Sequence, residues 1–214
     1  MRRKDRASLE LLKGKTNLKG IEIGVQTGVN AKWMLENLDI EKLYLIDPYT
    51  EYRCNNKKAP EDGGTHPATP ELKESCKALL KPWENKIEYI YKYSWGAISM
   101  FDPRSLDFVY VDGDHREDVI LEDLEYIDKI KLGGMLCGHD WRFKSIKAAL
   151  KRFVEERSYK LNCCKTKQLV QTVWYHSGGS DWWIHVPEGN QTKKYGCKLC
   201  QKVYSINVGE LQDV

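Results

Sequence analysis

Short apolar runs that stop at polar residues alternate with amphipathic segments along most of this chain. The apolar runs predict strands at 19–25, 43–47, 86–91, 108–111 and 135–137. The amphipathic segments predict helices at 5–13, 31–38, 71–80, 94–100, 119–130 and 144–156. Gly133-Gly134 is expected to end the fifth of these helices before the next strand begins. Strands that alternate with helices favour an α/β domain with a largely parallel sheet.

The pattern changes after the last helix. Three strand-like runs follow at 159–164, 170–176 and 182–186, and the turn-rich stretch 177–181 separates the last two. This arrangement is typical of a hairpin with a longer loop. We therefore expect an antiparallel edge hairpin on the otherwise parallel sheet.

Length and composition favour one domain that spans residues 1–214. Within it we expect a leading helix in 1–17, a lid or specificity loop at the Pro- and Gly-rich stretch 48–70, and a C-terminal extension at 188–214. A net charge of +3 is too small to indicate nucleic-acid binding. No apolar stretch is long enough for a membrane span, and no signal peptide is visible.

Seven cysteines without framework spacing indicate free thiols in a reducing, cytoplasmic compartment. Cys197 and Cys200 supply only two of the four ligands of a structural zinc site. Cys163, Cys164, His176 or His185 would complete such a site only if the tail folds back, so the role of this pair stays open. The oligomeric state stays open, and a homo-oligomer is compatible with the sequence.

Two neighbouring strand ends each carry an acid and a histidine. Asp112 and His115 follow the strand at 108–111, and His139 and Asp140 follow the strand at 135–137. Ligands of open α/β sheets bind in the crevice outside the carboxyl ends of the strands. Two converging carboxylates there would suit a hard divalent cation.

A glycine-containing turn follows the first strand. Glu22, Gly24 and Gly28 lack the spacing of the dinucleotide-binding fingerprint, but such glycines bring backbone N–H groups close to a ligand. The second strand ends at Asp47, at about the spacing where a dinucleotide-type fold places a ribose-binding acid.

The order E-I-G-V-Q-T-G, followed by a strand that ends in Asp47, resembles the S-adenosylmethionine-dependent methyltransferases of the Rossmann-like class. The stretches L-D-F-V-Y-V-D-G-D-H and L-G-G-M-L-C-G-H-D-W are similar to the small-molecule branch that includes the sugar O-methyltransferases of macrolide biosynthesis. The resemblance covers about residues 18–187 but not the loop at 48–70 or the tail. It implies a doubly wound, mostly parallel, seven-stranded sheet.

The resemblance also implies roles for individual residues. The S-adenosylmethionine site would consist of Glu22, Gly24, Gly28, Asp47, Ser94 and Asp112. Asp112 and Asp140 would hold Mg²⁺ or another divalent cation, and His115 would be the base that, with Asp112, activates the hydroxyl of a small-molecule acceptor such as a sugar. The sequence departs from several relatives at Trp141, where they carry a second acid or amide.

Plainer interpretations remain beside these. Asp112 would face the cofactor without a metal, and His115 and His139 would cap the segments that follow them. The whole chain would then be a non-catalytic module that binds a cofactor or an acidic partner, or a hydroxylase-like relative, because fold alone does not fix function. The histidine beside both acids favours the enzyme.

Overall fold

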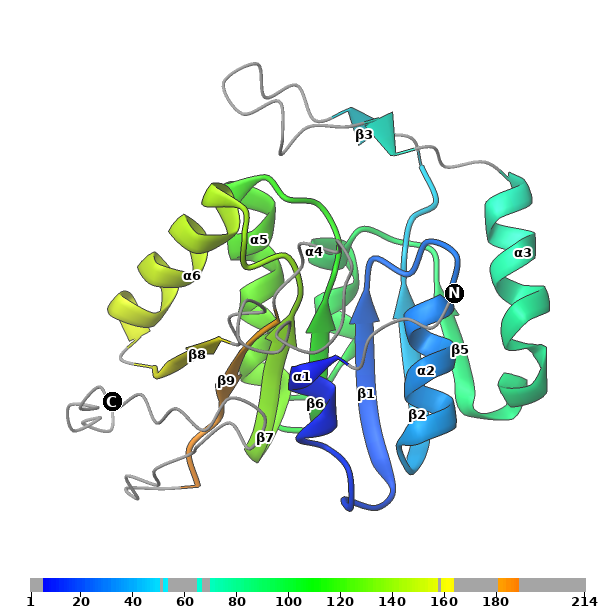
Figure 1. Ribbon diagram of the computed structural model, residues 1–214, viewed down its shortest axis with the longest axis horizontal. Helices are drawn as coiled ribbons and strands as arrows, with labels where there is room; N and C mark the ends of the chain where they lie inside the picture. The colour runs from blue at the N-terminus through cyan, green and yellow to red at the C-terminus, as the bar shows by residue number, and fades with distance from the viewer. Residues whose placement is uncertain are drawn as a thin grey trace, which may run out of the picture.

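A central sheet with helices on both faces forms this protein (Figure 1). The computed structural model describes residues 6–50, 52–53, 65–66, 70–157, 159–163 and 181–188. The helices are α1 (Ala7–Glu10), α2 (Val29–Asn37), α3 (Pro70–Leu80), α4 (Ser94–Ala97), α5 (Glu117–Leu124) and α6 (Lys144–Arg157). Short 3₁₀ segments lie at η2 (Lys81–Lys86), η3 (Ile98–Met100) and η4 (Glu125–Lys129). The strands are β1 (Leu18–Ile23), β2 (Ile40–Ile46), β3 (Tyr52–Arg53), β4 (Thr65–His66), β5 (Ile87–Ile90), β6 (Leu106–Val111), β7 (Ile130–Gly138), β8 (Leu161–Cys163) and β9 (Trp182–His185).

Seven strands form the main sheet in the order β5-β2-β1-β6-β7-β9-β8. The pairs from β5 to β7 are parallel, and β9 runs antiparallel to both β7 and β8. This confirms the predicted seven-stranded, mostly parallel sheet with an antiparallel element at one side. The predicted strand at 170–176 lies outside the described residues.

The central strands are mostly apolar because both faces of the sheet are covered. In β6, Phe108 and Tyr110 pack with α1, α2 and α3, while Val109 and Val111 pack with α4, α5 and α6. All four side chains are buried. Successive residues of a strand point to opposite faces, so this single run fills two cores.

The glycine pair Gly133-Gly134 lies inside β7 and does not separate a helix from a strand, as the sequence suggested. The helix ends earlier, and η4 leads directly into Ile130, the first residue of β7. The register against β6 shifts between Leu106 and Phe108, which marks a bulge. Gly133 has a φ of +77°, and a Cβ at Gly134 would lie 2.7 Å from the carbonyl oxygen of Asp107. Glycine is therefore needed for the bulge, and the prediction that this pair ends a helix is wrong.

The leading helix is shorter than expected, and the 48–70 stretch is described only in part. The leading helix covers only Ala7–Glu10, followed by turns. In the 48–70 stretch, β3 and β4 form a two-stranded antiparallel pair, and most of the rest lies outside the described residues. None of the helices in the described part of the chain is both long and apolar enough to cross a membrane.

Candidate active site

A cavity of about 580 Å³ lies at the carboxyl ends of the parallel strands. Its volume is in the range typical of small-molecule sites. The segments that follow β1, β2, β5, β6 and β7 all contribute to its wall. Seven predicted site residues line it: Glu22, Gly24, Asp47, Ser94, Asp112, His115 and Asp140. The structure thus brings the two predicted halves of the site together.

Gly24 lets the loop after β1 pass directly over the end of β6. Its φ is +82°, and a Cβ there would lie 2.4 Å from the carbonyl oxygen of Asp112. The N–H of Gly24 donates to the carbonyl of Ile46 at 2.9 Å, and the N–H of Asp112 donates to Ile23 at 2.8 Å. Three strand ends are therefore held together by backbone at the floor of the cavity.

Gly28 is not among the residues that line the cavity. It lies at the N-terminus of α2 with a φ of +73°, and a Cβ there would meet the Cys76 sulfur at 2.7 Å. Its position therefore serves the close packing of α2 on α3. The cofactor role predicted for Gly28 gains no support from this geometry.

Asp47 fixes the glycine loop from the neighbouring strand. One carboxylate oxygen accepts the N–H groups of Val25 at 3.0 Å and Gln26 at 2.9 Å, and the other accepts the N–H of Tyr49 at 2.8 Å. A carboxylate offers about four acceptor positions, so roughly one remains for a ligand hydroxyl. The hydroxyl of Tyr49 also donates to the Gln26 carbonyl at 2.9 Å, which closes the loop against β2.

The buried floor of the cavity contains two further acids. Glu22 is 1% exposed and accepts a 2.9 Å hydrogen bond from the side-chain amide of Asn30. Asp123 on α5 is fully buried near Ser94. Among the described residues neither oxygen of Asp123 has a hydrogen-bond partner, although the Ser94 side chain is close enough to lower the pKa of Asp123 somewhat. Burial therefore raises the pKa of Asp123 to about 7.

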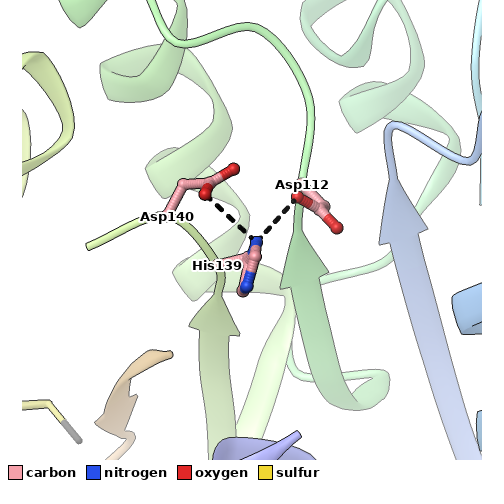
Figure 2. A group of neighbouring side chains, drawn as sticks. All are labelled: Asp112, His139 and Asp140. Atoms are coloured by element: carbon pink, nitrogen blue, oxygen red, sulfur yellow. Dashed lines mark ion pairs between the residues drawn. The ribbon is translucent and has the colours of Figure 1, made fainter. Parts of the chain in front are cut away.

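Figure 2 shows the cluster formed by Asp112, His139 and Asp140. The Nδ1 atom of His139 lies 3.6 Å from Asp112 Oδ1 and 3.3 Å from Asp140 Oδ1. Burial alone would lower the pKa of His139, but its two carboxylate partners outweigh burial and raise the pKa to about 9. One potential ligand atom from each residue lies within 4.8 Å of the others, which is close enough to share one metal ion. The sequence alone predicts no ligand role for His139.

Asp140 joins the two histidines of the site. Its Oδ2 lies 3.1 Å from His115 Nε2, and the His115 ring lies 4.5 Å from that of Phe143. Burial would raise the pKa of Asp140, but its interactions with His115 and His139 hold that pKa well below its usual range. Asp140 has a φ of +59°, a left-handed conformation that aspartate tolerates better than most residues. Trp141 packs against the hydrophobic core.

Arg6 also belongs to the site, although no sequence motif predicts this. It lines the cavity from the segment just before α1, and its Nη2 lies 3.1 Å from Asp112 Oδ2. Burial would lower the pKa of this guanidinium, but Tyr110, Asp112 and Asp181 outweigh it and raise the pKa. Arg6 and Asp112 are far apart in the sequence, and the fold brings them into contact.

Asp123 makes stability depend on pH. Its folded pKa lies above the unfolded value, so its stabilising contribution is present below the unfolded pKa and is lost as pH rises through about 7. We expect the stability of Asp123→Asn relative to the wild type to grow by about 2–3 kcal/mol between pH 5 and pH 8. Urea unfolding at both pH values measures this difference. Asp118→Asn, the same change at an exposed position of α5, is the control, and an equal response of the two variants would contradict the assignment.

The strand order and the position of the cavity define the class of protein. A parallel sheet with one antiparallel strand beside its edge, and an acid-lined cavity at the carboxyl ends, is the architecture of the Rossmann-like methyltransferases. A family model described as a methyltransferase domain matches residues 21–141, more than half of the chain. The chain belongs to this family and is a methyltransferase of the S-adenosylmethionine-dependent class. The search of curated proteins gave no match.

Solved structures agree on the fold. A Klebsiella pneumoniae protein, provisionally described as an O-methyltransferase, is 15% identical with a TM-score of 0.58, over 85% of this chain and 79% of that chain. A Streptococcus mutans protein, provisionally described as a methyltransferase and solved in complex with SAH (S-adenosylhomocysteine), is 12% identical with a TM-score of 0.57, over 86% and 98% of the chains. An rRNA methylase from Streptococcus thermophilus is 11% identical with a TM-score of 0.57, over 85% and 93%. Identities this low indicate a shared fold and leave the acceptor undetermined.

Proposed function

We propose that this protein transfers the methyl group of S-adenosylmethionine to a hydroxyl oxygen of a small molecule such as a sugar. The observation that carries this proposal is a shared cavity. The Asp–His cluster at the ends of β6 and β7 lies in the same space as the Gly24 loop and Asp47. The groups proposed to react and the groups proposed to bind the cofactor therefore line one cavity of about 580 Å³.

The cofactor half of the cavity is built mainly from backbone. Gly24 adds no side chain where its loop passes the end of β6, Asp47 keeps about one acceptor position for a ribose hydroxyl, and Ser94 faces the same space from the end of β5. Glu22 and Asp112 supply negative charge where the sulfonium and the ammonium of the cofactor would lie. The acceptor would enter beside His115 and Asp140.

His115 is the proposed general base. A hydroxyl is a weak nucleophile until its proton is removed, and a positioned imidazole contributes about 10²- to 10⁴-fold to such a step. The new O–C bond forms as the C–S bond breaks, S-adenosylhomocysteine leaves as a neutral thioether, and the hydroxyl proton passes to the imidazole. Asp140, 3.1 Å from His115 Nε2, orients the ring and stabilises the imidazolium that results.

The donor set at the strand ends fits a divalent cation. Asp112 and Asp140 would supply carboxylate oxygens, and His139 would supply the third ligand that Trp141 does not provide. Carboxylates suit both Mg²⁺ and Mn²⁺. An added imidazole ligand favours Mn²⁺, which is the transition metal of the two. A cation bound there would lower the pKa of a coordinated hydroxyl. Arg6, paired with Asp112, would stay at the edge of such a site.

The assay that tests this proposal follows S-adenosylhomocysteine release with a panel of hydroxylated acceptors. We expect release to depend on the acceptor and to fall at least about tenfold in EDTA. Mn²⁺ or Mg²⁺ in excess should restore it. Unchanged turnover in chelator would contradict the metal while leaving methyl transfer intact, whereas no release with any acceptor would favour a non-catalytic module.

We also expect a cytoplasmic protein, as the free cysteines Cys76 and Cys137 suit a reducing compartment.

A further inference from the structure

Arg6 is held in the wall of the cavity with unused hydrogen-bonding capacity. Its side chain is about one-tenth exposed, and its Nη1 lies 3.8 Å from Asp181 Oδ1. A guanidinium carries five N–H donors. The described residues accept only one hydrogen bond from Arg6, at Asp112, and the buried Nη1 makes none. A buried cation with spare donors is a built site for an anion.

The rest of the N-terminal segment keeps this guanidinium in place. The backbone N–H and the hydroxyl of Ser8 donate to Asp181 Oδ2 at 3.1 and 2.8 Å, just before β9. The guanidinium carbon lies 5.5 Å from the centre of the Tyr110 ring. Arg6 is therefore anchored from β6 and from the start of β9, so α1 is an integral part of the cavity.

The two ends of the cavity differ in character. Arg6, Glu22 and Asp112 make one part strongly charged. Elsewhere on the wall, Tyr93 and Trp95 stack with centroids 5.7 Å apart, and Trp95 is 59% exposed. S-adenosylmethionine has a zwitterionic amino acid at one end and a flat adenine at the other. Charge and shape therefore direct its amino-acid end toward Arg6.

We propose that Arg6 binds the α-carboxylate of S-adenosylmethionine, an inference that rests on the proposed function. The carboxylate would accept from guanidinium N–H groups that Asp112 does not use. The neighbouring acids Glu22 and Asp112 would attract the α-ammonium group of the same ligand. Arg6 is thus a determinant of cofactor affinity contributed by the N-terminal segment.

Calorimetric titration with two ligands tests this assignment. S-adenosylhomocysteine carries the amino-acid end, and 5′-methylthioadenosine lacks it. We expect Arg6→Met to weaken S-adenosylhomocysteine binding at least about tenfold and to leave 5′-methylthioadenosine binding within about twofold. Lys13→Met is the matched control, because Lys13 pairs with Glu10 at the surface of the same segment and does not line the cavity.

Equal weakening of both ligands, or unchanged S-adenosylhomocysteine binding, would overturn the role of Arg6. If Arg6→Met does not fold, the wild type alone decides the question with decarboxylated S-adenosylhomocysteine. That ligand should bind at least about tenfold more weakly than the parent, and equal affinity would overturn the inference. A wild type that binds none of these ligands would instead refute the proposed cofactor itself.

Discussion

Asp140→Asn is expected to lower kcat by about 10²- to 10⁴-fold while cofactor affinity changes by less than about threefold. Asparagine keeps the size of the side chain and tolerates the left-handed backbone at φ +59°. It removes the negative charge that faces His115 at 3.1 Å and His139 at 3.3 Å. Without this charge, the protonated imidazole that forms during methyl transfer loses its partner.

Steady-state turnover and S-adenosylhomocysteine titration measure the two effects separately. Asp102→Asn, the same change at an exposed residue outside the cavity, should leave both values unchanged. Turnover by Asp140→Asn at the level of Asp102→Asn would remove Asp140 from the mechanism. A parallel loss of cofactor binding would assign Asp140 to the cofactor instead of the reaction.

Gly24→Ala is expected to destabilise the fold by about 2–4 kcal/mol and to abolish cofactor binding. The new Cβ would lie 2.4 Å from the Asp112 carbonyl oxygen and 2.6 Å from Gly113 Cα. Both contacts are backbone and belong to the end of β6, so no side chain can move aside. A φ of +82° adds conformational strain for any residue with a Cβ.

Gly96→Ala is the matched control for this variant. Gly96 lies in α4, and a Cβ there would meet no atom within 4 Å. Alanine is favoured in helices, so we expect a change between zero and about 1 kcal/mol of added stability. Denaturant unfolding compares the two variants, and equal stability would show that the loop after β1 is not in close contact with β6.

The sheet was predictable because its strands lie between covered faces. Continuous apolar runs such as Phe108–Val111 are typical of buried parallel strands, and the acids that end them mark the edge where ligands bind. The bulge at Gly133-Gly134 was not predictable from local pattern. From local sequence alone, two adjacent glycines predict the end of a helix or strand. The strand continues through them only because the backbone of Asp107 approaches closely, which requires residues without a Cβ.

The part of the site that lies at the ends of the strands was predictable from the sequence. Asp112 and Asp140 follow neighbouring strands, so their proximity follows from the sheet. For His139 the only sequence signal was its position next to Asp140, which does not by itself indicate a ligand. In the structure the chain turns after β7, with Asp140 in a left-handed conformation, and both side chains line the cavity. Arg6 contacts a residue 106 positions away, and Gly28 packs on α3, so neither role had a local signal.

Transfer of the methyl group to an oxygen atom is the outcome that we propose for this cavity. S-adenosylmethionine with a ¹³C-labelled methyl, incubated with the protein and hydroxylated acceptors, tests it directly by the position of the label in the product. We expect a labelled methyl ether, formed by the wild type and not by Asp140→Asn. A label on nitrogen or carbon, or on no acceptor at all, would contradict it.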